Sequence, residues 1–373
     1  MVLVDTKVAN NGQAILDVVK TVTDKPVIMI INTHSHPDHN GSNAEIKAAY
    51  PNIDVVAHEN LRKRVADQLA APPGPRGPLA SPAQLPNISF TDKRSVLSGK
   101  DRIDLYYFGR GHTDNDTFVV FPSVRAMAIG DLMAWDMAPL IDPGTNGSVL
   151  ALPDTMEKAE KGIKNVDLVI EGHGNVNTWQ GMVDYATYMR ALTTESKKAY
   201  DAGKTPDDAF AELQKNAKFA KYFTHDLKPG LEYGSSPANR TLININVAFE
   251  ELAGEKVTTY FGGALKATDK HKGGSDPALL APPRPARLGP GPGGARRPRP
   301  LGGLAHVRPG ALRPPDPGGM VFGKAGPRLR LLLFRGPAPG ARSSEWDLTD
   351  PRLPAANRSS PSRGRGRSQK RRT

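Results

Sequence analysis

Cysteine is absent from the 373 residues of this chain, and so is any long apolar run. Without cysteine, disulfide bonds, cysteine-ligated zinc and thiol catalysis are excluded, although the cellular compartment stays open. The longest apolar runs, Val27–Ile31 and Leu331–Phe334, are far shorter than the roughly 20 residues that a membrane-spanning helix needs. The first residues, Met1–Asp5, offer no signal peptide. We therefore expect no membrane contact.

Acidic residues are scarce in the last part of the chain. Residues 269–373 hold 22 Lys and Arg against 6 Asp and Glu, a net charge of +16, together with 18 Pro and 17 Gly. Residues 1–268 hold 28 basic and 32 acidic residues, a net charge of −4. A segment so rich in Pro and Gly buries too little apolar surface to offset the entropy of ordering it. We predict a folded domain over 1–268 and a disordered, Pro/Gly/Arg-rich tail over 269–373.

Short apolar runs alternate with amphipathic stretches through the folded part, which is typical of an α/β protein. Strands are predicted at Val2–Val4, Val27–Ile31, Ile53–Ala57, Ile103–Phe108, Thr117–Phe121, Ala126–Ile129 and Asp167–Ile170. Helices are predicted after Asn11 and Ser42, at Glu59–Ala70, and at 153–164, 178–200, 206–219 and 243–252. Asn11 is predicted to cap its helix, and the spacing from Ser42 to Glu45 fits a capping box.

Metal-capable side chains follow four of these strands. They are His34, His36, Asp38, His39, His112, Asp131 and His173. Loops beyond the carboxyl ends of strands are where sites assemble in α/β sheets, and imidazole and carboxylate are good ligands for zinc and similar ions. A lone histidine is more often a core or surface residue, and we interpret His58, His225, His271 and His306 in that way. Five of the nine histidines nevertheless fall in these loops, which favours a metal site.

The segment Thr33–His39 resembles the His-x-His-x-Asp-His signature of the metallo-β-lactamase-fold hydrolases. The later Gly-His-Thr, Gly-Asp and Gly-His-Gly stretches fall in that family's order, and the resemblance covers residues 2–250. It implies an α/β fold, a four-layer αββα sandwich with the metal site at one edge of its sheets. The family has further strands before the Val-Asp-Thr at 4–6, so the resemblance implies an N-terminal truncation and an unpaired sheet edge at Val2–Val4.

The resemblance also assigns the ligands, position by position. His34, His36 and His112 would hold a first ion, Asp38, His39 and His173 a second, and Asp131 would bridge the two. This implies two divalent metal ions, with zinc preferred over iron or manganese. Asp5 is either a partner that orients a ligand imidazole or a turn residue at the strand end.

An aspartate at the position of Asp131 favours glyoxalase II, lactonase and thioesterase relatives, because the true β-lactamases of this fold lack it. We therefore predict a dinuclear metal-dependent hydrolase that cleaves an ester, thioester or lactone-like bond of a small molecule through a metal-bridging hydroxide. Asp38 is the predicted catalytic residue, orienting the nucleophile and carrying its proton. The stretch Asp136–Val149 is interpreted as either a pocket wall or a connecting loop.

Three alternatives remain open at this stage. The same site could act on a β-lactam or a phosphodiester. The basic run Arg363–Arg372 could bind nucleic acid without catalysis, although a solvated tail is the more common meaning of such a run. The third alternative is a fragment that keeps the ligands but folds too poorly to be active.

Overall fold

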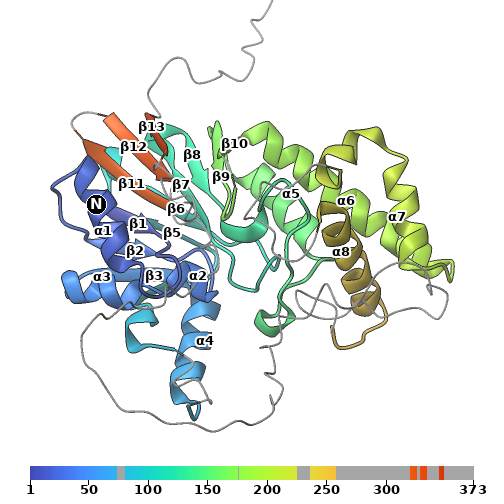
Figure 1. The fold of residues 1–373 in the computed structure, drawn as a ribbon, viewed down its shortest axis with the longest axis horizontal. Coiled ribbons are helices and arrows are strands. Elements are labelled where there is room, and N and C mark those ends of the chain that lie inside the picture. Colours follow the sequence, from blue (N-terminus) through green and yellow to red (C-terminus); the bar gives the residue numbers. More distant parts are fainter. Residues whose placement is uncertain are drawn as a thin grey trace, which may run out of the picture.

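The computed structural model describes residues 1–73, 80–174, 176–224 and 236–257, together with three strands at 320–325, 328–333 and 344–347. Two mixed sheets stack face to face, and helices cover their outer faces (Figure 1). This confirms the predicted four-layer αββα sandwich. No helix among the described residues combines the length and hydropathy needed to cross a bilayer.

The first sheet has seven strands in the order β13-β12-β11-β1-β2-β3-β4. Its strands are β1 Val2–Val4, β2 Met29–Ile31, β3 Asp54–His58, β4 Ile88–Phe90, β11 Met320–Ala325, β12 Arg328–Leu333 and β13 Ser344–Asp347. From β1 to β4 the strands are parallel, so their carboxyl ends share one edge. The edge beside β1, which the sequence predicts to be unpaired, is occupied by β11 in antiparallel register, with Leu3 opposite Val321.

Strands β11 to β13 lie within the segment predicted to be a disordered tail, and the rest of that segment lies outside the described residues. The predicted domain boundary near residue 268 and the histidines His225, His271 and His306 also lie outside them. Within the described part, the extended segments of this region add to the first sheet and leave no free edge on β1.

The second sheet has six strands in the order β10-β9-β8-β7-β6-β5. They are β5 Lys93–Val96, β6 Ile103–Tyr106, β7 Phe118–Phe121, β8 Ala126–Ala128, β9 Leu168–Ile170 and β10 Val176–Thr178. Strands β8 and β9 are parallel, and both end at the same edge as β2. The chain passes from the first sheet to the second between β4 and β5, two short strands that the apolar pattern did not reveal.

Strand alternation explains how each sheet packs on both faces. In β1, Val2 and Val4 point into the space between the sheets, whereas Leu3 packs outward against Ile15 of α1 and Ile46 of α3. In β7, Val119 likewise faces the first sheet. Each fully buried side chain of this size contributes roughly 1.5–3 kcal/mol relative to exposure, so both interfaces stabilise the sandwich.

Helices on the outer face of the first sheet are α1 Gly12–Val22, α3 Asn43–Ala49 and α4 Glu59–Ala70, and the short α2 Pro37–Asn40 follows β2 beyond the edge of the sheet. Helices α1 and α3 begin where predicted, but neither predicted cap forms. Glu45 accepts hydrogen bonds from the backbone N–H of Asn10 and Gly12, both at 2.6 Å, and so closes the start of α1 instead of its own helix. Ser42 donates to the carbonyl of Val8. Tertiary partners therefore replace the local caps.

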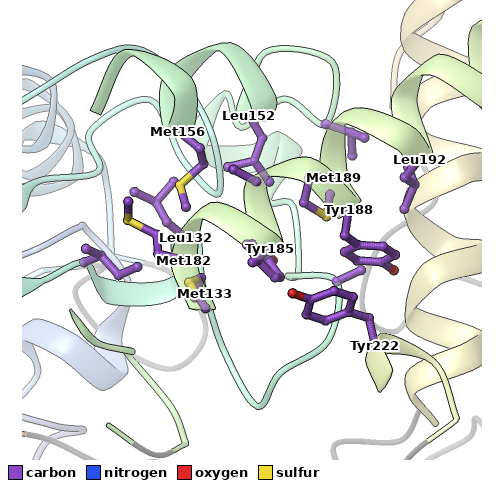
Figure 2. Close-up of a cluster of buried hydrophobic side chains, with 14 of the residues drawn as sticks. Leu132, Met133, Leu152, Met156, Met182, Tyr185, Tyr188, Met189, Leu192 and Tyr222 are labelled. Atoms are coloured by element: carbon purple, nitrogen blue, oxygen red, sulfur yellow. The ribbon is translucent and has the colours of Figure 1, made fainter. Parts of the chain in front are cut away.

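Helices beyond the second sheet are α5 Leu152–Gly162, α6 Trp179–Asp201, α7 Pro206–Gln214 and α8 Pro237–Leu252. Figure 2 shows methionine and tyrosine side chains of α6, among them Met182 and Tyr188, gathered with Leu152 and Met156 of α5. Helix α7 ends before its predicted limit, and a 3-10 helix, Ala217–Tyr222, follows it. Helix α8 begins six residues before the predicted 243, because Ser236 caps it and Pro237 opens it.

Candidate metal centre

All seven metal-capable residues predicted from the sequence lie together at the carboxyl ends of β2, β6, β8 and β9. They form two groups, in each of which the ligand atoms lie within 4.8 Å of one another. The three-histidine group is His34, His36 and His112. The mixed group is Asp38, His39, Asp131 and His173.

Nitrogen atoms converge at the centre of the three-histidine group. His36 Nδ1 lies 3.2 Å from His34 Nε2 and 2.9 Å from His112 Nε2. His34 and His112 are almost fully buried, and burial together with neighbouring imidazoles lowers the pKa of both, that of His112 to about 4. These two rings are therefore neutral at pH 7, which is the form that binds a metal ion.

Carboxylates and imidazoles alternate in the mixed group. Asp131 Oδ1 lies 3.2 Å from His39 Nε2, and its Oδ2 lies 3.2 Å from His173 Nε2. Asp38 Oδ2 lies 3.2 Å from the same nitrogen of His173. Asp131 Oδ2 is also 3.7 Å from His112 Nε2. One carboxylate thus reaches both groups.

The carboxylates reverse the pKa shifts in the mixed group. Burial alone would lower the pKa of His173, but Asp131 outweighs it and raises the value to about 9. Burial acts in the same direction on His39, and the nearby Asp131 and Asp38 carboxylates hold its pKa well above the usual range. Burial would raise the pKa of Asp131, yet His173 and His39 hold it well below normal. Without a metal ion these groups pair as ions.

A divalent cation fits this donor set. Asp131 Oδ1 is buried and accepts no well-aligned hydrogen bond from the described residues, and the polar atom described beside it is His39 Nε2 at 3.2 Å, a ligand nitrogen of the same group. A buried carboxylate is costly unless positive charge balances it, and a cation held between these atoms would supply that charge. Three imidazole nitrogens in one group, and two carboxylates with two imidazoles in the other, are the ligand types that zinc and similar divalent ions prefer.

Four of the five histidine rings have a polar partner on the nitrogen that faces away from the centre. On the side away from the centre, His34 Nδ1 lies 3.1 Å from Thr33 Oγ1, and His112 Nδ1 contacts the carbonyl of Leu140. Two rings face carboxylates: His36 Nε2 lies 2.8 Å from Asp142 Oδ2, and His39 Nδ1 lies 2.7 Å from Asp5 Oδ2. Two roles were considered for Asp5, and its contact with His39 is the one expected of a residue that orients a ligand ring. Such partners fix the orientation and tautomer of a ligand ring.

Glycine allows the closest approach in the site. A Cβ atom on Gly172 would lie 1.9 Å from Asp131 Oδ1 and 2.7 Å from the backbone carbon of Gly130. The loop that follows β9 therefore passes against the Asp131 carboxylate only because residue 172 has no side chain.

Three residues near the site were not identified from the sequence. Asp142 follows no strand, and its Asp-Pro-Gly context indicates only a turn. Trp135 stacks on the His173 ring, with centroids 4.6 Å apart and planes 17° from parallel. Asp116 is buried, and burial raises its pKa to about 7, although Thr113 donates to it from both its hydroxyl and its backbone N–H. Strand-end reasoning finds ligands but not the residues that support them.

His58, in contrast, contacts Tyr107 and the carbonyl of Thr91, as expected for a core histidine.

A cavity of about 870 Å³ lies against residues 142–151, and its lining includes none of the seven metal-capable residues. Its lining includes Arg110, Asp142, Ser148, Leu150, Glu251 and Lys256. Asp142 belongs both to this lining and to the contacts of His36. The stretch that the sequence left open as a pocket wall or a connecting loop therefore lines a cavity over its second half.

Known proteins resemble a part of the chain that carries six of the seven metal-capable residues, all except His173. Residues 2–134 match the family described as the Metallo-beta-lactamase superfamily. The chain is 26% identical over 177 residues to the metallo-beta-lactamase type 2 of Bacillus sp. (strain 170), an alignment that covers 47% of this chain and 63% of that protein. It is 30% identical over 125 residues to the hydroxyacylglutathione hydrolase of Synechocystis sp., which covers 34% of this chain and 41% of that protein. The chain thus spans less than two thirds of either relative.

A solved structure shares the fold. The stereoselective inverting sec-alkylsulfatase from Pseudomonas sp. superposes with a TM-score of 0.51 at 15% sequence identity, over 68% of this chain and 46% of that one. An identity this low speaks for the fold alone.

Proposed function

The chain belongs to the metallo-beta-lactamase superfamily, and from this premise we propose that it is a dinuclear metal-dependent hydrolase acting on an ester, thioester or lactone-like bond. The observation that carries the proposal is the position of Asp131, whose carboxylate lies within 3.2 Å of two ligands of the mixed group and 3.7 Å from His112 of the other. A carboxylate in this position suits two neighbouring ions rather than one.

His34, His36 and His112 would hold the first ion and Asp38, His39 and His173 the second, with Asp131 shared. When bound, divalent ions supply Lewis acidity and lower the pKa of water toward neutrality, which suits hydrolysis at physiological pH. Zinc is the metal we favour for this mixture of imidazole and carboxylate, with iron or manganese as alternatives.

Asp38 is the residue of the chain that we propose for proton handling. Its side chain is about one quarter exposed, whereas the histidines around it are almost fully buried, so it can meet both water and substrate. His39 and His173 outweigh the effect of burial and hold its pKa well below normal, which keeps it an acceptor. Asp38 would orient the attacking water, take its proton, and deliver that proton to the departing alcohol or thiol.

A panel of substrates tests the reaction class. Ester, thioester, lactone, phosphodiester and β-lactam substrates are assayed with and without chelator on protein of known metal content. We expect turnover of an acyl substrate that chelator abolishes and zinc restores. Asp38→Asn should lower kcat by at least about 100-fold, and Asp17→Asn, an exposed aspartate of α1, is the matched control. Near-full kcat in Asp38→Asn would contradict its assignment.

A β-lactam substrate is the second candidate, because the chain is also similar to a protein named as a metallo-beta-lactamase. Asp131 argues against it, since the β-lactamases of this fold lack a bridging aspartate. Turnover of the β-lactam alone in the same panel would replace the acyl-ester proposal while leaving the metal site in place.

A further inference from the structure

His36 differs from the other four histidines of the centre in the nitrogen that it presents. The rings of His34, His39, His112 and His173 direct Nε2 toward their group, whereas His36 directs Nδ1. Its Nε2 lies instead 2.8 Å from Asp142 Oδ2. A neutral imidazole carries one proton, and the nitrogen that donates it to a carboxylate leaves the other with a free lone pair. The contact with Asp142 therefore decides which nitrogen of His36 is available as a ligand.

We propose that Asp142 is the positioning residue of the three-histidine group, and that the 139–151 loop that carries it sets the affinity of the first ion. The inference rests on the proposed two-ion hydrolase. It concerns how one of the two ion sites is held, and it assigns Asp142 no contact with substrate.

The two carboxylate oxygens of Asp142 have separate partners. Oδ1 accepts the backbone N–H of Gly144 at 2.8 Å, which closes the Asp-Pro-Gly turn. Oδ2 faces His36 Nε2. A residue needed only for the turn would use Oδ1 and leave Oδ2 to solvent, and the side chain is 23% exposed, which leaves room for that. The second oxygen is thus committed to the ligand ring.

The same loop also holds the second ring of the group. The backbone N–H of Asp142 donates to the carbonyl of His112 at 3.1 Å, and Leu140 offers its carbonyl to His112 Nδ1. A Cβ atom on Gly147 would lie 2.3 Å from the His112 carbonyl oxygen, so the loop lies directly against this backbone. One loop therefore supports two of the three histidines.

Helix α8 anchors the loop at both ends. Asn244 Nδ2 donates to the carbonyl of Pro139 at 2.8 Å. Glu251 accepts the backbone N–H of Val149 at 2.8 Å and the hydroxyl of Ser148 at 2.6 Å. The position of Asp142 thus depends on a helix about a hundred residues further along the chain.

Zinc binding by the full chain tests the proposal. Apparent affinities are measured by competition with a chromophoric chelator, and the same variants are loaded with Co²⁺ so that the absorption spectrum reports ligand geometry. Wild type should bind two ions. In Asp142→Ala the affinity for one ion should fall about 10–100-fold while the other stays within about threefold, as expected when an outer partner of a ligand is lost. The Co²⁺ spectrum should change for that ion only.

Arg64→Ala is the matched control. Arg64 Nη1 donates to the carbonyl of Gly144 at 2.8 Å, so its removal loosens the same turn without touching the Asp142 side chain or His36. It should leave both affinities unchanged. Asp142→Asn keeps the side-chain shape and one acceptor oxygen, and should give an intermediate loss even if Asp142→Ala folds poorly.

Two results would overturn the proposal: equal affinities in wild type and both Asp142 variants, or an equal loss in Arg64→Ala, which would show that turn order alone matters. A wild-type protein that binds no zinc would refute the proposed function itself, so the two failures are distinguishable.

Discussion

The two halves of the candidate metal centre differ in charge and in what supports them. The three-histidine group has only imidazole donors and depends on the 139–151 loop and α8. The mixed group adds the carboxylates of Asp38 and Asp131, and its His39 ring is held by Asp5 directly after β1. A cation in the mixed group would have two carboxylates to balance its charge, whereas a cation in the three-histidine group would share only that of Asp131. The two groups therefore differ in the direction of their histidine pKa shifts and in the segments of the chain that hold them.

The largest effect is expected from the loss of Asp131, because its carboxylate lies near residues of both groups. Asp131→Ala removes the carboxylate that reaches both groups, so both affinities should fall, and activity should drop by more than the roughly 10–100-fold that loss of an outer partner costs. Metal analysis and kcat measure this, with Asp136→Ala, an exposed aspartate in the same loop, as the control. Normal binding of one ion in Asp131→Ala would show that the residue serves a single site.

Proton release should separate the halves next. The pKa of His173 is about 9 and that of His39 is also raised, so a cation in the mixed group must displace protons at pH 7. Each displaced proton makes the apparent affinity rise about tenfold per pH unit until the pH exceeds the raised pKa. His112, with a pKa of about 4, carries no proton to displace above pH 6. Zinc titrations from pH 6 to 9, with calorimetry in two buffers, measure this. Equal pH dependence of the two ions would contradict the contrast.

The free energy of unfolding should depend more on Asp5, which supports the mixed group, than on Asp142, which supports the three-histidine group. Asp5 accepts the backbone N–H of Thr33 at 2.8 Å and its hydroxyl at 2.7 Å, besides contacting His39. Asp5→Ala leaves these buried groups without an acceptor and should lower the free energy of unfolding of the metal-free protein by about 2–4 kcal/mol. Asp142→Ala should cost about 1 kcal/mol or less. Urea unfolding measures both, and a larger loss in Asp142→Ala would reverse the ranking of rigidity.

The smallest effect is expected at the opposite ends of two strands that lead to the centre. Arg125 and Asp167 precede β8 and β9 and form an exposed ion pair at 2.5 Å. The hydrogen bond from Arg125 lowers the pKa of Asp167 below its unfolded value, so the pair stabilises the fold above pH 4 and loses this effect as the pH falls through the folded pKa. Asp167→Asn should cost about 0.5 kcal/mol or less at pH 7, with zinc affinity unchanged. A measurable change in zinc binding would show that the strand starts also shape the site.

Strand ends and candidate ligands could be predicted because both correspond to short, recognisable stretches of sequence. An apolar run such as that of β2 indicates a buried strand whatever its neighbours are, and the polar residues that follow it can only lie at its carboxyl end. The short strands β4, β5 and β10 carry too few apolar residues to leave such a mark. The predicted caps at Asn11 and Ser42 do not form, because Glu45 of α3 accepts the backbone N–H groups at the start of α1.

The sequence alone determined the fold class and the seven metal-capable residues, because hydrophobic periodicity and the spacing of His and Asp are properties of the chain itself. Only the tertiary structure decided how those residues are held. Asp142 contacts His36, and Glu251 accepts a hydrogen bond from the loop that carries Asp142. Strand β11 pairs with the edge of β1. Each of these contacts joins segments that are far apart in the sequence. Such partners are selected by packing in three dimensions, so no local pattern could reveal them.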